Sequence, residues 1–227
     1  MEKKRSLRVL ASLGVMAVTL PLAFGQALAE NKQTPAFAAF VKAFAAVSDY
    51  RDQIVVHETN DDGSQTEDRT YAYMWKRPTS AKIDIIDGPG KGGGVVWTGG
   101  DKGTGHQGGI LSGIKASISI NDPRATSLRG DTLEVASFEW ELKHFLSMPG
   151  TLSDSPGPAL EGGATTAVTL TVTNPKTNGN VSKDVLYLSN TTHLPTRREQ
   201  YVGSRLVKTE TFKDVKVNNG FTASDFQ

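Results

Sequence analysis

The first regular pattern of hydrophobic positions in the chain has the period of a helix. Phe37, Phe40, Val41 and Phe44 recur at the spacing of one helix face. Thr34 and Pro35 precede them and suit an N-cap and a first helical turn. We therefore predict a helix here, with a large apolar face. That face either packs into a core or lines and plugs an apolar cavity.

Most of the remaining pattern alternates between apolar and polar residues, as expected for half-buried strands. Tyr71, Tyr73 and Trp75 share one face of such a run, and Val168, Leu170 and Val172 share another. The alternation predicts nine strands, at residues 50–57, 70–76, 82–87, 94–98, 114–120, 165–173, 181–189, 196–202 and 206–217. Turn-forming residues at 99–102, 174–180 and 202–204 separate several of them.

A second helix is predicted between residues 137 and 148. Ser137 can cap it, and Phe138, Leu142, Phe145 and Leu146 share a face. Pro149 and Gly150 end it, and residues 150–164, which are rich in Gly, Pro and Ser, are predicted to form a loop.

These elements predict a mainly β, α+β protein with one large antiparallel sheet. A sheet of that many strands must curl or close to hide its face and edges, and strongly apolar helices could fill the hollow. No repeat or interdomain linker interrupts the pattern, so residues 30–227 are predicted to form a single domain.

The N-terminus has the pattern of a secretory signal peptide. Basic residues between positions 3 and 8 precede an apolar stretch at 9–24, and Ala27-Leu28-Ala29 matches a cleavage signal. We expect cleavage after Ala29 and a periplasmic location for the mature chain. The apolar stretch is shorter than the roughly 20 residues of a membrane span.

Composition narrows the possible functions. The 227 residues carry 25 Lys and Arg, 24 Asp and Glu and no Cys, for a formal net charge of +1. Loss of the signal peptide would change this net charge to −2. The charge balance offers no field for binding nucleic acid, and the lack of Cys excludes disulfides, thiolate metal sites and N-terminal lipidation.

Few motifs point to catalysis or a cofactor. Residues 88–93 match G-x-G-x-x-G, but a strand follows instead of a helix, so we interpret them as a Gly-rich connection between strands. The four His have no metal-ligand spacing. No cofactor and no metal is therefore expected. A hydrolase that uses Ser112 with His106 stays open as a third alternative, because catalytic triads assemble in space.

One segment carries a resemblance to a known family. Residues 74–78, Met-Trp-Lys-Arg-Pro, are followed by a strand at 82–85 and a Gly-containing turn after 95–98. This order, with the first helix before it and the strand at 206–217 after it, resembles the LolA-like superfamily of periplasmic lipoprotein carriers. The family's aromatic residue after the Lys-Arg-Pro motif is missing near Ala81, so the chain resembles a divergent subgroup.

The resemblance implies an unclosed β-barrel, with helices as a lid and an apolar cavity for acyl chains. Arg77 occupies the position of the motif arginine that holds the lid in this family; alternatively, it only ends a strand at the barrel rim. The candidate residues of the cavity and lid are Phe37, Phe40, Val41, Phe44, Trp75, Arg77, Trp97, Leu142 and Phe145.

The expected function is that of a non-enzymatic carrier of lipoprotein acyl chains or other lipids. Its partners would include a donor complex in the inner membrane and an acceptor at the outer membrane. An envelope sensor of the RseB type, which shares the fold and acts through protein contacts, is the main alternative.

Overall fold

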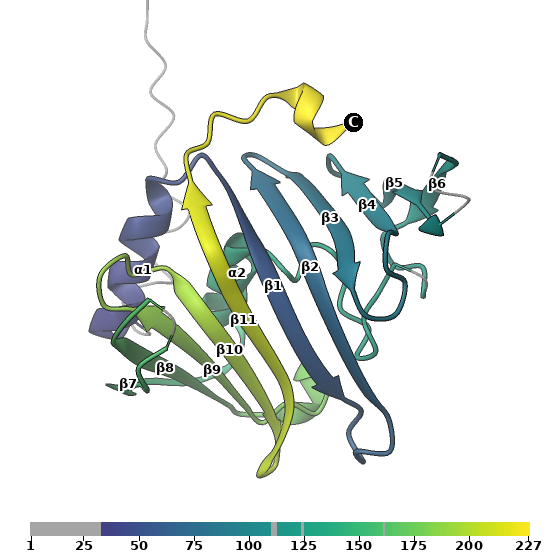
Figure 1. The fold of residues 1–227 in the computed structure, drawn as a ribbon. Helices are drawn as coiled ribbons and strands as arrows, with labels where there is room; N and C mark the ends of the chain where they lie inside the picture. Colours follow the sequence, from purple (N-terminus) through teal and green to yellow (C-terminus); the bar gives the residue numbers. More distant parts are fainter. Residues whose placement is uncertain (1–32, 110–112, 124, 161) are drawn as a thin grey trace, which may run out of the picture.

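A computed structural model describes residues 33–109, 113–123, 125–160 and 162–227. Its centre is one antiparallel sheet of 11 strands in the order β6-β5-β4-β3-β2-β1-β11-β10-β9-β8-β7 (Figure 1). In the described chain no pairing joins β6 to β7, so the sheet is curved but not closed into a barrel. The predicted fold class is confirmed. The predicted signal peptide lies outside the described residues.

The first half of the chain builds one side of the sheet. Helix α1 (Pro35–Ala45) precedes β1 (Asp49–Thr59), β2 (Thr66–Lys76) and β3 (Ser80–Asp87). Three short strands follow, β4 (Gly94–Trp97), β5 (Lys102–His106) and β6 (Lys115–Ser119). Each strand pairs with the next, so this half is a meander that starts at the centre of the sheet and ends at one edge.

The second half builds the other side. Helix α2 (Phe138–Ser147) leads into β7 (Gly150–Pro156) at the opposite edge, and the chain returns through β8 (Thr165–Val172), β9 (Lys183–Ser189), β10 (Pro195–Val202) and β11 (Arg205–Val217). Short 3-10 helices, η2 (Pro175–Asn178) and η3 (Ala223–Phe226), follow β8 and β11. Strand β11 pairs with β1 and thereby joins the two halves.

Both predicted helices are confirmed, and their N-terminal caps form as expected. The Thr34 side chain accepts a hydrogen bond from the Phe37 backbone N–H, and Ser137 accepts one from Trp140. The free N–H of Phe138 donates to the Tyr50 hydroxyl at 3.0 Å. These contacts satisfy amide groups that a helix start leaves without partners.

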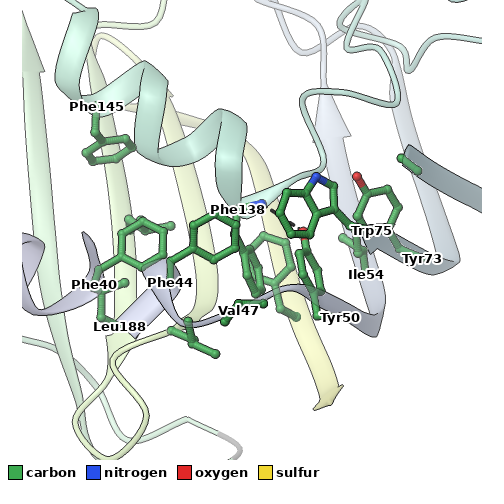
Figure 2. Close-up of a cluster of buried hydrophobic side chains, with 14 of the residues drawn as sticks. Phe40, Phe44, Val47, Tyr50, Ile54, Tyr73, Trp75, Phe138, Phe145 and Leu188 are labelled. Carbon is green, nitrogen blue, oxygen red and sulfur yellow. Dashed lines mark hydrogen bonds between the residues drawn. The ribbon is translucent and has the colours of Figure 1, made fainter. Parts of the chain in front are cut away.

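Aromatic side chains of both helices pack together against aromatic residues on the inner face of the sheet (Figure 2). Phe40 and Phe44 have ring centroids 6.0 Å apart, Phe44 and Trp75 5.3 Å, and Tyr50 stacks on Phe138 at 4.5 Å. Pairs at such distances add about 0.5–1.5 kcal/mol each beyond their burial. We call this set the aromatic cluster: Phe37, Phe40, Phe44, Tyr50, Tyr73, Trp75, Phe138, Phe145 and Phe212.

Two strands correct the sequence analysis. Strand β5 is absent from the prediction, because Gly103 and Gly105 lower the β propensity of this segment. The strand forms because it pairs with β4 on one side and β6 on the other. Residues 150–156 were predicted as loop but form β7, which pairs along its whole length with β8. An edge strand tolerates Pro and Asp, and Asp154 on β7 accepts a hydrogen bond from the Ala36 N–H at the start of α1.

Candidate functional site

A cavity of about 790 Å³ lies against the half of the sheet formed by β1 to β6. Its opposite wall is the segment at residues 125–136, which leads into α2. Apolar side chains make up much of the wall, namely Val56, Tyr71, Ile83, Ile85, Val95, Ile118 and Leu133. The volume falls within the roughly 300–1,000 Å³ that is usual for sites that bind small molecules.

Glycines form the side of the cavity near β4 and β5. A Cβ atom on Gly94 would lie 2.6 Å from the Ile83 carbonyl oxygen, and one on Gly108 would lie 2.1 Å from the carbonyl oxygen of Lys91. Both positions therefore require Gly, because the backbones approach each other too closely for a side chain. The glycines therefore let neighbouring backbone segments lie close together in this wall. The Gly-rich run at 88–93 is confirmed as a connection between strands, β3 and β4.

Polar contacts fix the 125–136 segment over the cavity. The Glu58 carboxylate, at the end of β1, accepts hydrogen bonds from the Leu128 N–H at 2.7 Å and from the Ser127 hydroxyl at 3.0 Å. Arg129 donates to the Thr59 carbonyl oxygen at 2.9 Å. Burial raises the pKa of Glu58, and the nearby Lys208 ammonium opposes that shift. The segment is thus attached to the sheet by charged groups rather than by apolar contacts alone.

A cluster of three charged side chains, Lys208, Asp131 and Glu210, lies in the wall of the cavity. The Lys208 Nζ is 2.8 Å from Glu210 Oε1 and is also hydrogen-bonded to Asp131 Oδ2. Burial alone would lower the pKa of Lys208, but Asp131 and Glu210 outweigh it and raise that pKa. Burial would raise the pKa of Asp131, yet the Lys208 charge and hydrogen bond hold it below its ordinary value. Lys208 and Asp131 are therefore both ionised at neutral pH.

A second, fully buried network lies beside this group. The Arg198 guanidinium makes two hydrogen bonds to Asp184, at 2.9 and 2.7 Å, and one to Glu141 at 3.0 Å. Its Nη1 is also 3.4 Å from Glu210 Oε2, so the two networks share Glu210. Burial and neighbouring carboxylates raise the pKa of Glu141 well above its ordinary value, although Arg198 opposes this shift.

The predicted site residues gather in one place, but not at the cavity. Six of them are buried in the core, namely Phe37, Phe40, Phe44, Trp75, Trp97 and Phe145, and Val41 and Leu142 pack against it. Figure 2 shows Phe40, Phe44, Trp75 and Phe145. None of the nine predicted residues lines the cavity. Trp75 lies at the end of β2, whereas Tyr71, farther back along the same strand, lines the cavity. Their role in ligand binding stays a prediction.

Arg77 joins the end of β2 to α1. Its Nε donates to the Val47 carbonyl oxygen at 2.8 Å, and its Nη2 donates to the Phe44 carbonyl oxygen at 3.0 Å. Its guanidinium carbon lies 4.9 Å from the centroid of the Phe44 ring. A cation is favourable at the C-terminal end of a helix, where carbonyl groups lack partners. Arg77 therefore contacts the C-terminal end of α1, and its role in holding a lid over a cavity stays a prediction.

The sequence analysis missed the residues that do line the cavity. Ile83 and Ile85 lie in a strand that was predicted, but alternation alone does not tell which face of a strand meets an open space. The clustering of Gly near positions 88–109 was the available signal, since Gly in or beside strands often marks a close approach of backbone or ligand.

Only one residue of the alternative hydrolase site, His106 with Ser112, lies in the described part of the chain. His106 lines the cavity, and its Nε2 lies 3.7 Å from Asp84 Oδ1, whereas Ser112 lies outside the described residues. Among the described residues, no group of three or more His, Cys, Asp or Glu could hold a metal ion. Likewise, no described helix combines the length and the hydropathy needed to cross a membrane.

No protein-family model and no curated protein matches the chain. Solved structures match its fold. An uncharacterized conserved protein from Thermus thermophilus aligns at a TM-score of 0.50 and 10% identity, over 84% of this chain and 90% of that one. A putative outer membrane lipoprotein-sorting protein domain from Vibrio parahaemolyticus aligns at 0.44 and 13%, over 84% and 95%.

A LolA superfamily protein from Nitrosomonas europaea is also similar, with a TM-score of 0.42 and 11% identity over 86% of this chain and 98% of that one. The likeness is one of fold. The match at a TM-score of 0.50, together with the unclosed sheet and its two helices, agrees with the predicted mainly β architecture.

Proposed function

We propose that this protein is a non-enzymatic periplasmic carrier that binds the acyl chains of a lipoprotein or of another lipid in the cavity over β1 to β6. The observation that carries the proposal is the cavity itself. It is large, it is walled by aliphatic side chains and Gly backbone, and it lies beside a core that is already filled by aromatic rings.

The energetics suit a carrier. Transfer of an acyl chain from water to an apolar site gains roughly 0.8 kcal/mol for each buried CH₂, so a fatty chain gains on the order of 10 kcal/mol. That gain lets a protein compete with a membrane for its cargo, and it requires no catalytic group. Release then depends on opening the cavity at a partner, such as an acceptor at the outer membrane.

Native mass spectrometry with lipid extraction tests the proposal, on protein purified from the periplasm of its own host. Ala116 on β6 lines the cavity and is exposed, so Ala116→Trp should fill the space without disturbing the core. Ser119, on the same strand and outside the cavity wall, gives the matched control Ser119→Trp. We expect co-purifying lipid on the wild type and on Ser119→Trp, and its loss from Ala116→Trp.

Two results would contradict the proposal. A wild-type protein that stays empty with added phospholipid or lipopeptide, yet binds the ectodomain of an inner-membrane protein, would favour the sensor alternative. Turnover of a lipid ester that is abolished by His106→Ala would favour a hydrolase, because His106 is the titratable group of that hypothesis within the described cavity wall.

A further inference from the structure

The cations in the cavity wall already have anionic partners. Among the described residues of the wall, Arg69 faces Glu67, with Nε 2.9 Å from Oε1 and Nη2 3.0 Å from Oε2. Lys91 Nζ is 3.3 Å from Asp87 Oδ1. The third cation, Lys208, contacts two carboxylates at once.

The surroundings of Lys208 are particularly unfavourable for an incoming anion. The side chains of Lys208 and Glu210 are 3% and 4% exposed, and that of Asp131 is 28% exposed. Two carboxylates therefore surround one buried ammonium, and the more accessible carboxylate belongs to Asp131. Glu58 is close enough to raise the pKa of Lys208 further. The Arg198 guanidinium is close enough to lower it, but Arg198 is fully buried and already paired with Asp184 and Glu141.

These contacts discriminate between ligands by charge. A carboxylate or phosphate brought against this wall would lose its water without gaining a free cation, and burying an unpaired ion is unfavourable. A hydroxyl or amide N–H, in contrast, could donate to Asp131, and a hydrocarbon chain would meet the aliphatic part of the wall.

We propose that the cavity selects lipid segments that are uncharged, such as acyl chains in ester or amide linkage with hydroxyl groups, and rejects segments that carry an anionic group into it. Asp131 and Glu210 are the residues that determine this specificity. The inference rests on the proposed function, since it describes what the same cavity accepts.

Three probes of equal chain length separate the possibilities: hexadecanediol, with a hydroxyl at each end, hexadecanedioic acid, with a carboxyl at each end, and hexadecanoic acid. The single-headed acid can leave its carboxylate at the opening, whereas the diacid must bury one. Affinities follow from displacement of the neutral fluorophore N-phenylnaphthylamine at neutral pH. We expect the diol to bind at least tenfold more tightly than the diacid.

The variant Asp131→Asn removes one negative charge and keeps an oxygen that can accept from Lys208. It should improve the affinity for the diacid severalfold and so reduce the ratio of diol to diacid affinity, and Glu210→Gln should act in the same direction. Asp68→Asn is the matched control, because Asp68 is an exposed carboxylate outside the cavity wall. Circular dichroism and thermal unfolding verify that each variant is folded.

The outcomes separate this inference from the proposed function. Equal affinity for all three probes, or a preference for the diacid, overturns the selectivity while lipid binding stands. If Asp131→Asn and Asp68→Asn change the diacid affinity equally, the effect comes from the overall charge of the protein, and the role of Asp131 is overturned. Failure of every probe to displace the fluorophore overturns the proposed function, and the selectivity with it.

Discussion

Arg198 provides the sharpest test of how the buried charges stabilise this fold. Its side chain has no exposed surface, and its guanidinium makes two hydrogen bonds to Asp184 and one to Glu141. The variant Arg198→Met keeps much of the aliphatic volume and removes the charge. It leaves Asp184 with Gln200 Nε2 at 3.1 Å and His144 Nε2 at 3.3 Å as its remaining polar neighbours.

The expected loss is large, because a buried carboxylate is left without its cation. Breaking one side of such a pair lowers the free energy of unfolding by about 3–5 kcal/mol. The neighbouring Arg197 is the control: its side chain is 30% exposed and pairs with Glu199 at 2.8 Å. Arg197→Met should lower the free energy of unfolding by only about 0–1 kcal/mol.

The loss should also depend on pH in a defined direction. Burial would raise the pKa of Asp184, but Arg198 outweighs it and lowers that pKa in the folded wild type. Asp184 therefore stabilises the wild type above the pKa of an unfolded Asp, about 3.9, and this contribution is lost as pH falls through the folded pKa. Without Arg198, burial dominates and the folded pKa rises, so the variant loses stability as pH increases from about 4.

Urea unfolding, followed by tryptophan fluorescence and far-UV circular dichroism, measures both effects at neutral pH and near pH 4. The difference between wild type and Arg198→Met should be greatest at neutral pH and should shrink on acidification. A difference below about 1 kcal/mol at neutral pH, or one that grows on acidification, would refute the reasoning about this network.

Three further predictions concern single residues. Both carboxylate oxygens of Asp52 are buried and have no hydrogen-bond partner among the described residues. Burial, with a contribution from Glu210, raises the pKa of Asp52 well above its ordinary value, so Asp52 destabilises the fold as pH rises above about 3.9. Asp52→Asn should therefore be more stable than the wild type at neutral pH and equal to it near pH 3 in urea unfolding; an equal gain at both pH values would contradict this. Phe40 is fully buried in the aromatic cluster, so Phe40→Ala should lose about 3–5 kcal/mol of unfolding free energy, and a loss below about 1 kcal/mol would show that the cluster is loosely packed. Arg77→Met should lower the protection of α1 from hydrogen exchange, and so the free energy of opening this helix, by about 1–2 kcal/mol, because two hydrogen bonds from an exposed side chain to carbonyl groups are lost. Unchanged exchange in α1 would show that Arg77 does not hold this helix.

Local patterns in the sequence were sufficient for most elements. Each helix has its cap and its apolar face within a dozen residues, and Thr34 and Ser137 form the expected hydrogen bonds. All nine predicted strands occur, since alternation over several residues reports that one face of a strand is buried. The resemblance around Arg77 indicated an unclosed sheet covered by helices, which the structure has.

Partners far apart in the sequence decided the rest. Strand β5 has too little β propensity to be predicted locally, and its pairing with β4 fixes it. Strand β7 is fixed by its ladder with β8 and by the hydrogen bond that Asp154 accepts from the Ala36 N–H at the start of α1. The cavity likewise depends on the tertiary structure: the aromatic residues of α1 and α2 pack on Tyr50 and Trp75 near one end of β1 and β2, whereas Val56 and Tyr71, farther along the same two strands, line the cavity.

The ion pairs show the same division between sequence and structure. Asp131 and Lys208 are 77 positions apart, and Glu141 and Arg198 are 57 positions apart, so no local pattern relates them. A charged residue in a sequence is expected to be solvated, because burying it alone is costly. Only the folded chain brings each charge to its partner, and those contacts determine both the stability of this core and the charge that its cavity presents to a ligand.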